Sequence, residues 1–78
     1  MMKNLSFSEA LFQLEKGKRM MRSQWDNEFV ALNWNEEKEY GSPYFYMSND
    51  KEKNPDKCSV WLPSMADILS KEWMAWEG

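Results

Sequence analysis

The sequence of 78 residues contains no histidine, one cysteine and three glycines. Without histidine, the Ser-His-Asp and Cys-His arrangements of nucleophilic catalysis are impossible, and the common zinc sites are excluded. The single cysteine, Cys58, cannot form an internal disulfide, and we interpret it as a buried structural thiol in a strand. Three glycines leave no glycine-rich phosphate loop. These absences predict a binding protein and not an enzyme, with no metal and no cofactor.

Positive charge and long apolar runs are also scarce. The formal net charge is −3, and the sequence pI is about 4.9. Proteins that bind nucleic-acid polymers normally carry a basic surface, so this class is disfavoured. No apolar run approaches the roughly 20 residues that span a bilayer, and no signal-peptide pattern opens the sequence. We therefore expect no membrane partner and a cytoplasmic location.

Aromatic residues and methionine are abundant, with five Trp, four Phe, three Tyr and seven Met. A domain of this size buries only about 60–65% of the surface that its unfolded chain exposes, so its own core is marginal. Small domains usually gain stability from disulfides, a metal or association. Because the first two are excluded, the composition predicts an oligomer, with part of the aromatic surface in an interface or a ligand pocket.

The segment from Leu5 to Gly17 has the pattern of an amphipathic helix. Ser6 and Glu9 are spaced as a capping box, in which each side chain satisfies a backbone N–H at the helix start. Apolar residues then recur at helical spacing on one side, namely Phe7, Ala10, Leu11 and Leu14. Gly17 can adopt the left-handed conformation that ends many helices. The pattern therefore predicts both ends of this helix.

Four segments after the helix are rich in strand-forming residues: 18–22, 28–35, 44–47 and 58–62. In the second, alternate residues fall on two faces, with Val30, Leu32 and Trp34 on one and Phe29, Ala31 and Asn33 on the other. The third is apolar on both faces, which predicts a central strand. The polar stretches 36–43 and 48–57 are expected to be loops, and Asn54-Pro55-Asp56 is a turn signal.

A second, shorter helix is predicted after Pro63. Ser64 can cap it, Asp67 lies three residues further on, and its apolar side is formed by Met65, Ile68 and Leu69. A final strand over 71–76 places Trp73 and Ala75 on one face. The order of elements predicts an α+β fold, a small antiparallel sheet with two short helices, as a single domain over residues 1–78.

Four cations lie directly before a tryptophan: Lys16, Lys18, Arg19 and Arg22 precede Trp25. Aromatic side chains stack on nucleobases for about 1–3 kcal/mol each, and arginine binds phosphate bidentately. Because the rest of the chain is acidic, the combination favours a small nucleotide over a polymer. In the alternative interpretation, the cations form a solvated surface and Trp25, Trp61 and Trp73 belong to the core.

Two blocks of the sequence resemble a known family. The first block is Phe7-x-x-Ala10-Leu11-x-x-Leu14-x-x-Gly17-Lys18 followed by Arg22-x-x-Trp25. The second is Trp61-x-Pro63-Ser64-x-x-Asp67-x-Leu69, ending in Glu72-Trp73. Together they resemble the Thoeris anti-defence protein 2 family of small phage and bacterial proteins. Length and block order agree with this family across the whole chain.

The resemblance implies a function that composition does not. Members of the family act as sponges, which bind nucleotide signals of bacterial immune systems and hold them without cleaving them. Thoeris signals are cyclised ADP-ribose derivatives, and some relatives also hold cyclic oligonucleotides. The family folds as an antiparallel sheet with short helices, forms a homotetramer and places its ligand pockets at subunit contacts. The resemblance thus implies a cyclic ADP-ribose-type ligand and, for a phage-encoded member, the host cytoplasm.

Under this hypothesis five residues bind the ligand: Phe7, Arg22, Trp25, Trp61 and Asp67. The aromatic residues supply apolar and stacking walls, and Arg22, taken as a surface arginine, contacts a phosphate. Each has a structural alternative, since the aromatic residues can belong to the core and Asp67 can complete a helix cap. The competing functions are an inhibitor that binds a host protein through an aromatic patch and an enzyme that degrades the signal.

Overall fold

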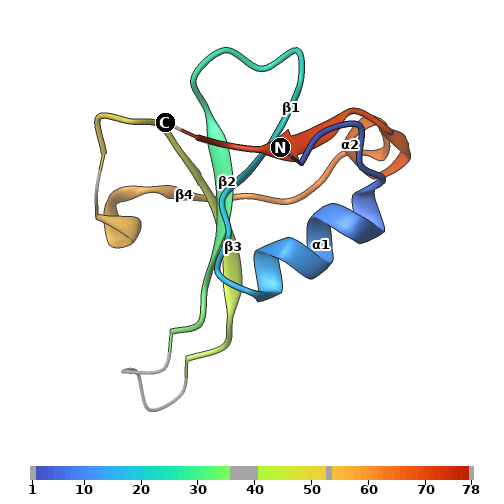
Figure 1. The fold of residues 1–78 in the computed structure, drawn as a ribbon. Helices are drawn as coiled ribbons and strands as arrows, with labels where there is room; N and C mark the ends of the chain where they lie inside the picture. Colours follow the sequence, from blue (N-terminus) through green and yellow to red (C-terminus); the bar gives the residue numbers. More distant parts are fainter. Residues whose placement is uncertain (1, 36–40, 53, 78) are drawn as a thin grey trace.

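A computed structural model describes residues 2–35, 41–52 and 54–77. The element order is α1 (Phe7–Glu15), β1 (Met20–Arg22), β2 (Phe29–Asn33), β3 (Tyr44–Ser48), a 3₁₀ turn (Pro55–Lys57), β4 (Ser59–Val60), α2 (Met65–Leu69) and β5 (Trp73–Ala75). The strands form one antiparallel sheet in the order β4-β3-β2-β1-β5 (Figure 1). The predicted α+β fold, an antiparallel sheet with two helices, is confirmed.

Helix α1 begins and ends where local chemistry predicts. The Ser6 hydroxyl accepts a hydrogen bond from the Glu9 N–H at 3.2 Å, and the Glu9 carboxylate accepts one from the Ser6 N–H at 3.0 Å. Gly17 follows the helix with a φ of 89°, in the left-handed region. Ala10 and Leu14 are fully buried and belong to the apolar cluster between α1 and the sheet. The helix therefore covers one face of the sheet.

The two faces of the sheet carry separate apolar clusters, as the alternation in 28–35 predicts. The larger cluster lies between α1 and the sheet and contains Ala10, Leu14, Met20, Val30, Trp61 and Trp73. The smaller cluster, on the opposite face, contains Phe29, Ala31 and Tyr46. The Arg19 guanidinium lies over the rings of Phe29 and Trp76 in the second cluster, at 5.0 and 5.6 Å from their centroids.

Some element boundaries differ from the sequence predictions. The predicted strand over 58–62 is reduced to Ser59–Val60, so Cys58 precedes the strand and is half-buried, with a free thiol. Strand β3 has neighbours on both sides, but the middle strand of the sheet is β2. The predicted loop 36–43 lies partly outside the described residues. None of the helices within the described ranges is long and apolar enough to cross a membrane.

Helix α2 has the predicted capping box and an unexpected orientation. The Ser64 hydroxyl accepts from the Asp67 N–H at 3.2 Å, and Asp67 accepts from the Ser64 N–H at 2.8 Å. The side that faces the domain carries Asp67. The predicted apolar side instead faces outward, with exposed fractions of 68% for Met65, 41% for Ile68 and 69% for Leu69.

Candidate ligand-binding site

An ion pair joins β1 to α2 on the inner side of the helix. Arg22 Nη1 lies 2.9 Å from Asp67 Oδ1, and the two side chains are only 15% and 11% exposed. The second oxygen, Oδ2, accepts hydrogen bonds from the Ser64 N–H and hydroxyl at 2.8 and 3.0 Å. Burial raises the pKa of Asp67, but the hydrogen bonds from Ser64 and Arg22 outweigh it and hold that pKa below its ordinary value. Asp67 is therefore an ionised cap residue whose two carboxylate oxygens both accept hydrogen bonds.

The Arg22 guanidinium is occupied on a second side as well. The Gln24 side-chain amide is placed in the orientation that gives both its oxygen and its nitrogen a hydrogen-bond partner. In this orientation the Gln24 oxygen accepts from Arg22 Nη2 at 2.6 Å. Arg22 Nε is buried and has no hydrogen-bond partner among the described residues. The sequence interpretation of Arg22 as a surface arginine is wrong, because β5 and α2 lie beside β1 and enclose the side chain.

An aromatic cluster surrounds Trp73, which is fully buried. Its ring lies 5.4 Å from Trp25, 6.0 Å from Trp61 and 5.7 Å from Phe7, centroid to centroid. The contacts with Trp25 and Trp61 are edge-on, at interplanar angles of 77° and 80°. The indole N–H of Trp73 donates to the backbone carbonyl of Asp67 at 2.9 Å. Trp73 thus connects the aromatic residues to α2.

The structure brings the five predicted site residues into one connected region. Phe7, Trp25 and Trp61 meet at Trp73, and Arg22 and Asp67 pair beside it. Trp61 and Asp67 are buried, whereas Phe7 and Trp25 are half-buried. The aromatic contacts are therefore mostly internal, and a stacking role of Trp25 or Trp61 on a ligand stays a prediction.

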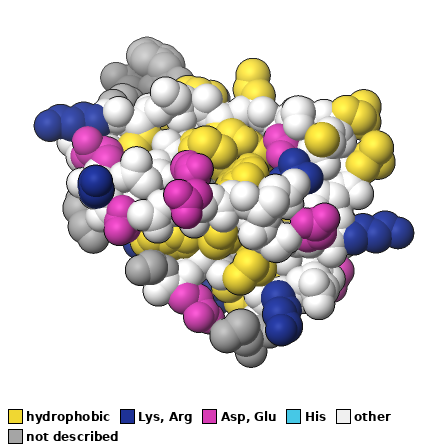
Figure 2. Space-filling model, turned by 90° about the horizontal axis from the view of Figure 1, so that it is seen from above, with side chains coloured by type: hydrophobic (Ala, Val, Ile, Leu, Met, Phe, Trp, Pro, Cys, Tyr) yellow, Lys and Arg dark blue, Asp and Glu magenta, His cyan; other side chains and the backbone are white. Residues whose placement is uncertain are grey.

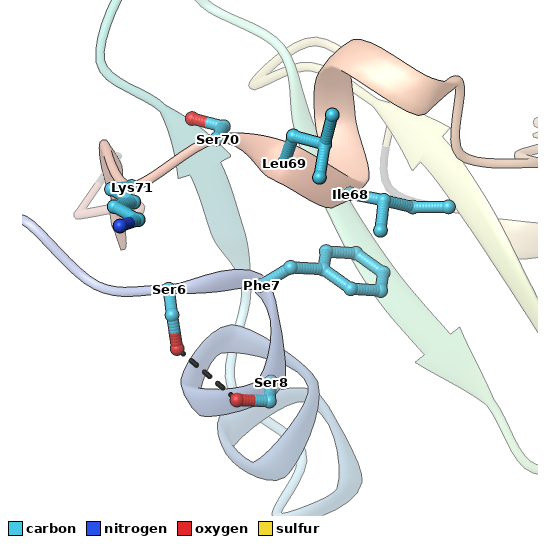
Figure 3. A pocket seen from close by; sticks show the side chains of 7 residues that line it. All are labelled: Ser6, Phe7, Ser8, Ile68, Leu69, Ser70 and Lys71. Atoms are coloured by element: carbon cyan, nitrogen blue, oxygen red, sulfur yellow. Dashed lines mark hydrogen bonds between the residues drawn. The ribbon is translucent and has the colours of Figure 1, made fainter.

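A groove of about 310 Å³ lies between the start of α1 and the end of α2 (Figure 3). Its lining comes from two short segments and consists of Ser6, Phe7, Ser8, Ile68, Leu69, Ser70 and Lys71. An antiparallel bridge holds the two segments together, since the Leu5 N–H donates to the Trp73 carbonyl at 2.9 Å and the Trp73 N–H to the Leu5 carbonyl at 3.1 Å. Of the five predicted residues, Phe7 lines this groove.

Sequence reasoning did not assign the other groove residues to the site. Lys71 lies in a stretch taken as part of a strand, and Ile68 and Leu69 follow a helical pattern that core residues also show. The groove depends on the bridge between Leu5 and Trp73, which are 68 positions apart in the chain. No local pattern signals such a contact.

Exposed apolar side chains continue from the groove along the outer side of α2. We call Leu62, Met65, Ile68 and Leu69 the outer α2 surface; Leu62, just before the helix, is 81% exposed. Figure 2 shows apolar side chains gathered on the surface at the end of the molecule where α2 lies. Contiguous exposed apolar surface usually marks a binding or association site. Within the described ranges, no group of three or more His, Cys, Asp or Glu side chains could hold a metal ion.

The comparison with protein families decides the family. The model of the Tad2-like domain, the Thoeris anti-defense 2-like domain, matches residues 5–76. The chain belongs to this family. The match confirms the resemblance carried by the two motif blocks, and the family name indicates an anti-defence role against Thoeris. No curated protein matches the chain.

Proposed function

We propose that this protein binds a cyclic ADP-ribose-type signal of a bacterial immune system and sequesters it without cleaving it. The observation that carries the proposal is the groove between α1 and α2. Its volume of about 310 Å³ lies near the lower limit of small-molecule sites, roughly 300–1,000 Å³. Apolar walls with a few polar groups at one end are the usual composition of such sites. Membership of the Thoeris anti-defence family supports an immune signal as the ligand.

The groove chemistry supports holding the ligand intact. A serine nucleophile needs an adjacent base, and none of the lining residues is an acid or a histidine. The one basic side chain of the lining, Lys71, forms no hydrogen bond to a lining serine within the described residues. The Ser6 hydroxyl already accepts from the Glu9 N–H and lies 3.2 Å from the Ser8 hydroxyl. The Ser6 hydroxyl thus serves the helix cap and the Ser8 hydroxyl lies beside it, which favours a binding role over hydrolysis.

The predicted site residues then divide by position. Phe7 contacts the ligand directly, as a wall of the groove. Arg22 and Asp67 support the groove from behind, because their ion pair fixes α2. Trp61 supports it by packing against Trp73. Trp25 is half-buried beside the same tryptophans, and we keep it as a stacking candidate for a ligand that extends beyond the groove.

We further propose that the protein is a homotetramer that acts in the host cytoplasm. The outer α2 surface supports self-association, because four apolar side chains are exposed there on a small domain without disulfides. Ile68 and Leu69 belong to this surface and also line the groove. A second copy that covers the surface therefore closes the groove and buries more of the ligand.

The same surface favours one alternative function. An inhibitor of a host protein also needs an exposed apolar patch, and α2 supplies one. The two functions differ in what the protein retains on its own, because a sponge holds its ligand without a host protein.

The test incubates the protein with a panel of nucleotides, removes free nucleotide, denatures the protein and analyses what is released. The panel contains cyclic ADP-ribose, its isomers closed through a ribose–ribose bond, and cyclic dinucleotides. Recovery of one intact cyclic ADP-ribose isomer is the expected result. A changed product would show an enzyme, and retention of none of the panel would contradict the proposal and leave the inhibitor alternative.

A further inference from the structure

The groove has two chemically different ends. Figure 3 shows Ser6, Ser70 and Lys71 at one end, and Phe7, Ile68 and Leu69 at the other. A cation and hydroxyl groups suit a phosphate, whereas a phenyl ring opposite two aliphatic side chains suits a flat, weakly polar group such as a nucleobase. A ligand with an anionic part and an aromatic part therefore fits in one orientation.

The cation that faces this groove is Lys71, whose side chain is exposed. The arginine that sequence reasoning assigned to a phosphate, Arg22, does not line the groove and is paired with Asp67 at 2.9 Å. Moving Arg22 to a ligand would leave the buried Asp67 carboxylate without its ion-pair partner, which is costly.

Two carboxylates lie next to the polar end of the groove, and a carboxylate that faced the groove would repel an anionic ligand. The Glu9 carboxylate accepts a hydrogen bond from the Ser6 N–H at 3.0 Å, and the Glu72 carboxylate accepts one from the Ser23 hydroxyl at 2.6 Å. Both are engaged by neighbouring groups and neither lines the groove. Lys71 is thus the charged side chain that a ligand in the groove meets.

We infer that Lys71 is the phosphate contact of this groove and that the nucleobase or another flat group of the ligand packs on Phe7. The inference rests on the proposed function and assigns the orientation of the nucleotide within it. A charge-assisted contact of this kind changes affinity by about ten- to a hundred-fold.

The test is a calorimetric titration of the full chain at pH 7, at two salt concentrations. The probe is the cyclic ADP-ribose isomer that the parent chain retains in the panel. Lys71→Gln is expected to weaken binding by about ten- to a hundred-fold and to reduce the salt dependence of the affinity. Lys71→Arg should retain most of the affinity. The matched control, Lys51→Gln, removes an exposed lysine in the loop after β3 and should bind like the parent.

The outcomes separate this inference from the proposed function. If the parent binds a cyclic ADP-ribose isomer and Lys71→Gln binds it equally well, the assignment of Lys71 is wrong and the sequestering function stands. Equal losses in Lys71→Gln and Lys51→Gln would also overturn it, because the effect would then reflect net charge. If the parent binds no member of the panel, the proposed function fails and the groove assignment fails with it.

Discussion

The inner and outer sides of α2 differ in almost every physical property. The inner side holds an ion pair, a capping box and a hydrogen bond from the Trp73 indole, and Asp67 takes part in all three. The outer side carries Met65, Ile68 and Leu69, which are exposed. A short helix usually turns its apolar side to the core, and here a carboxylate occupies that side. The inner side therefore serves stability, and the outer side is the part of the helix to which we assign binding.

The largest expected effect comes from the centre of the inner region. Trp73→Ala removes a fully buried indole and its hydrogen bond to Asp67, which should cost about 3–5 kcal/mol of unfolding free energy. For a domain of this size, that loss leaves little net stability. Urea denaturation followed by circular dichroism measures it.

A matched tryptophan provides the control. Trp34→Ala alters an exposed residue after β2 and should change the unfolding free energy by about 1 kcal/mol or less. Similar losses in the two variants would show that Trp73 is not the centre of the inner region.

The ion pair on the inner side should contribute less to the unfolding free energy than Trp73 does. Asp67→Asn keeps the shape of the side chain but leaves the Arg22 guanidinium without its carboxylate, at a cost of about 1–3 kcal/mol. The same substitution at exposed Asp26 should be nearly neutral. Thermal melting of the two variants checks the difference, and equal melting temperatures would contradict a stabilising role of the pair.

The contribution of Asp67 should depend on pH in a defined direction. Its folded-state pKa is lowered, so the stability that it supplies is present above the unfolded pKa of about 3.9 and is lost as the pH falls through the folded pKa. The difference in unfolding free energy between parent and Asp67→Asn should therefore narrow below about pH 4. Denaturation at several pH values measures this difference. A difference that stays constant down to pH 2 would contradict the predicted pH dependence.

Changes on the outer side should affect the fold least. The double variant Leu62→Glu and Met65→Glu places charges on the outer α2 surface outside the groove, so it should lower the oligomer mass and leave the protomer folded. Light scattering after size exclusion measures the mass. Phe12→Glu, on the exposed side of α1, is the control and should keep the parent mass. A parent chain that is already a monomer at micromolar concentration would contradict self-association.

Local patterns predicted much of the fold. The capping box at Ser6, the left-handed Gly17 and the alternation around Val30 each depend on a few neighbouring residues, and each is confirmed. The orientation of α2 could not be read in this way. It follows from the pairing of Asp67 with Arg22, 45 positions away, and from the packing of both beside Trp73.

The candidate site was only partly predictable for the same reason. The motif blocks name residues that gather at Trp73, but most of them turn inward and support the fold. The groove is formed by residues that flank these motifs, such as Lys71. Sequence spacing gives no information on which of the residues around the buried Trp73 face solvent.

One melting series tests the division between the two sides of α2 most directly. Parent, Asp67→Asn and Lys71→Gln are melted with and without a saturating amount of the retained cyclic ADP-ribose isomer, because a ligand that binds the folded state raises the melting temperature. Asp67→Asn is expected to melt below the parent and to keep its ligand-induced shift, whereas Lys71→Gln is expected to melt like the parent and to lose most of the shift. The reverse pattern, with the shift lost in Asp67→Asn and kept in Lys71→Gln, would contradict this division.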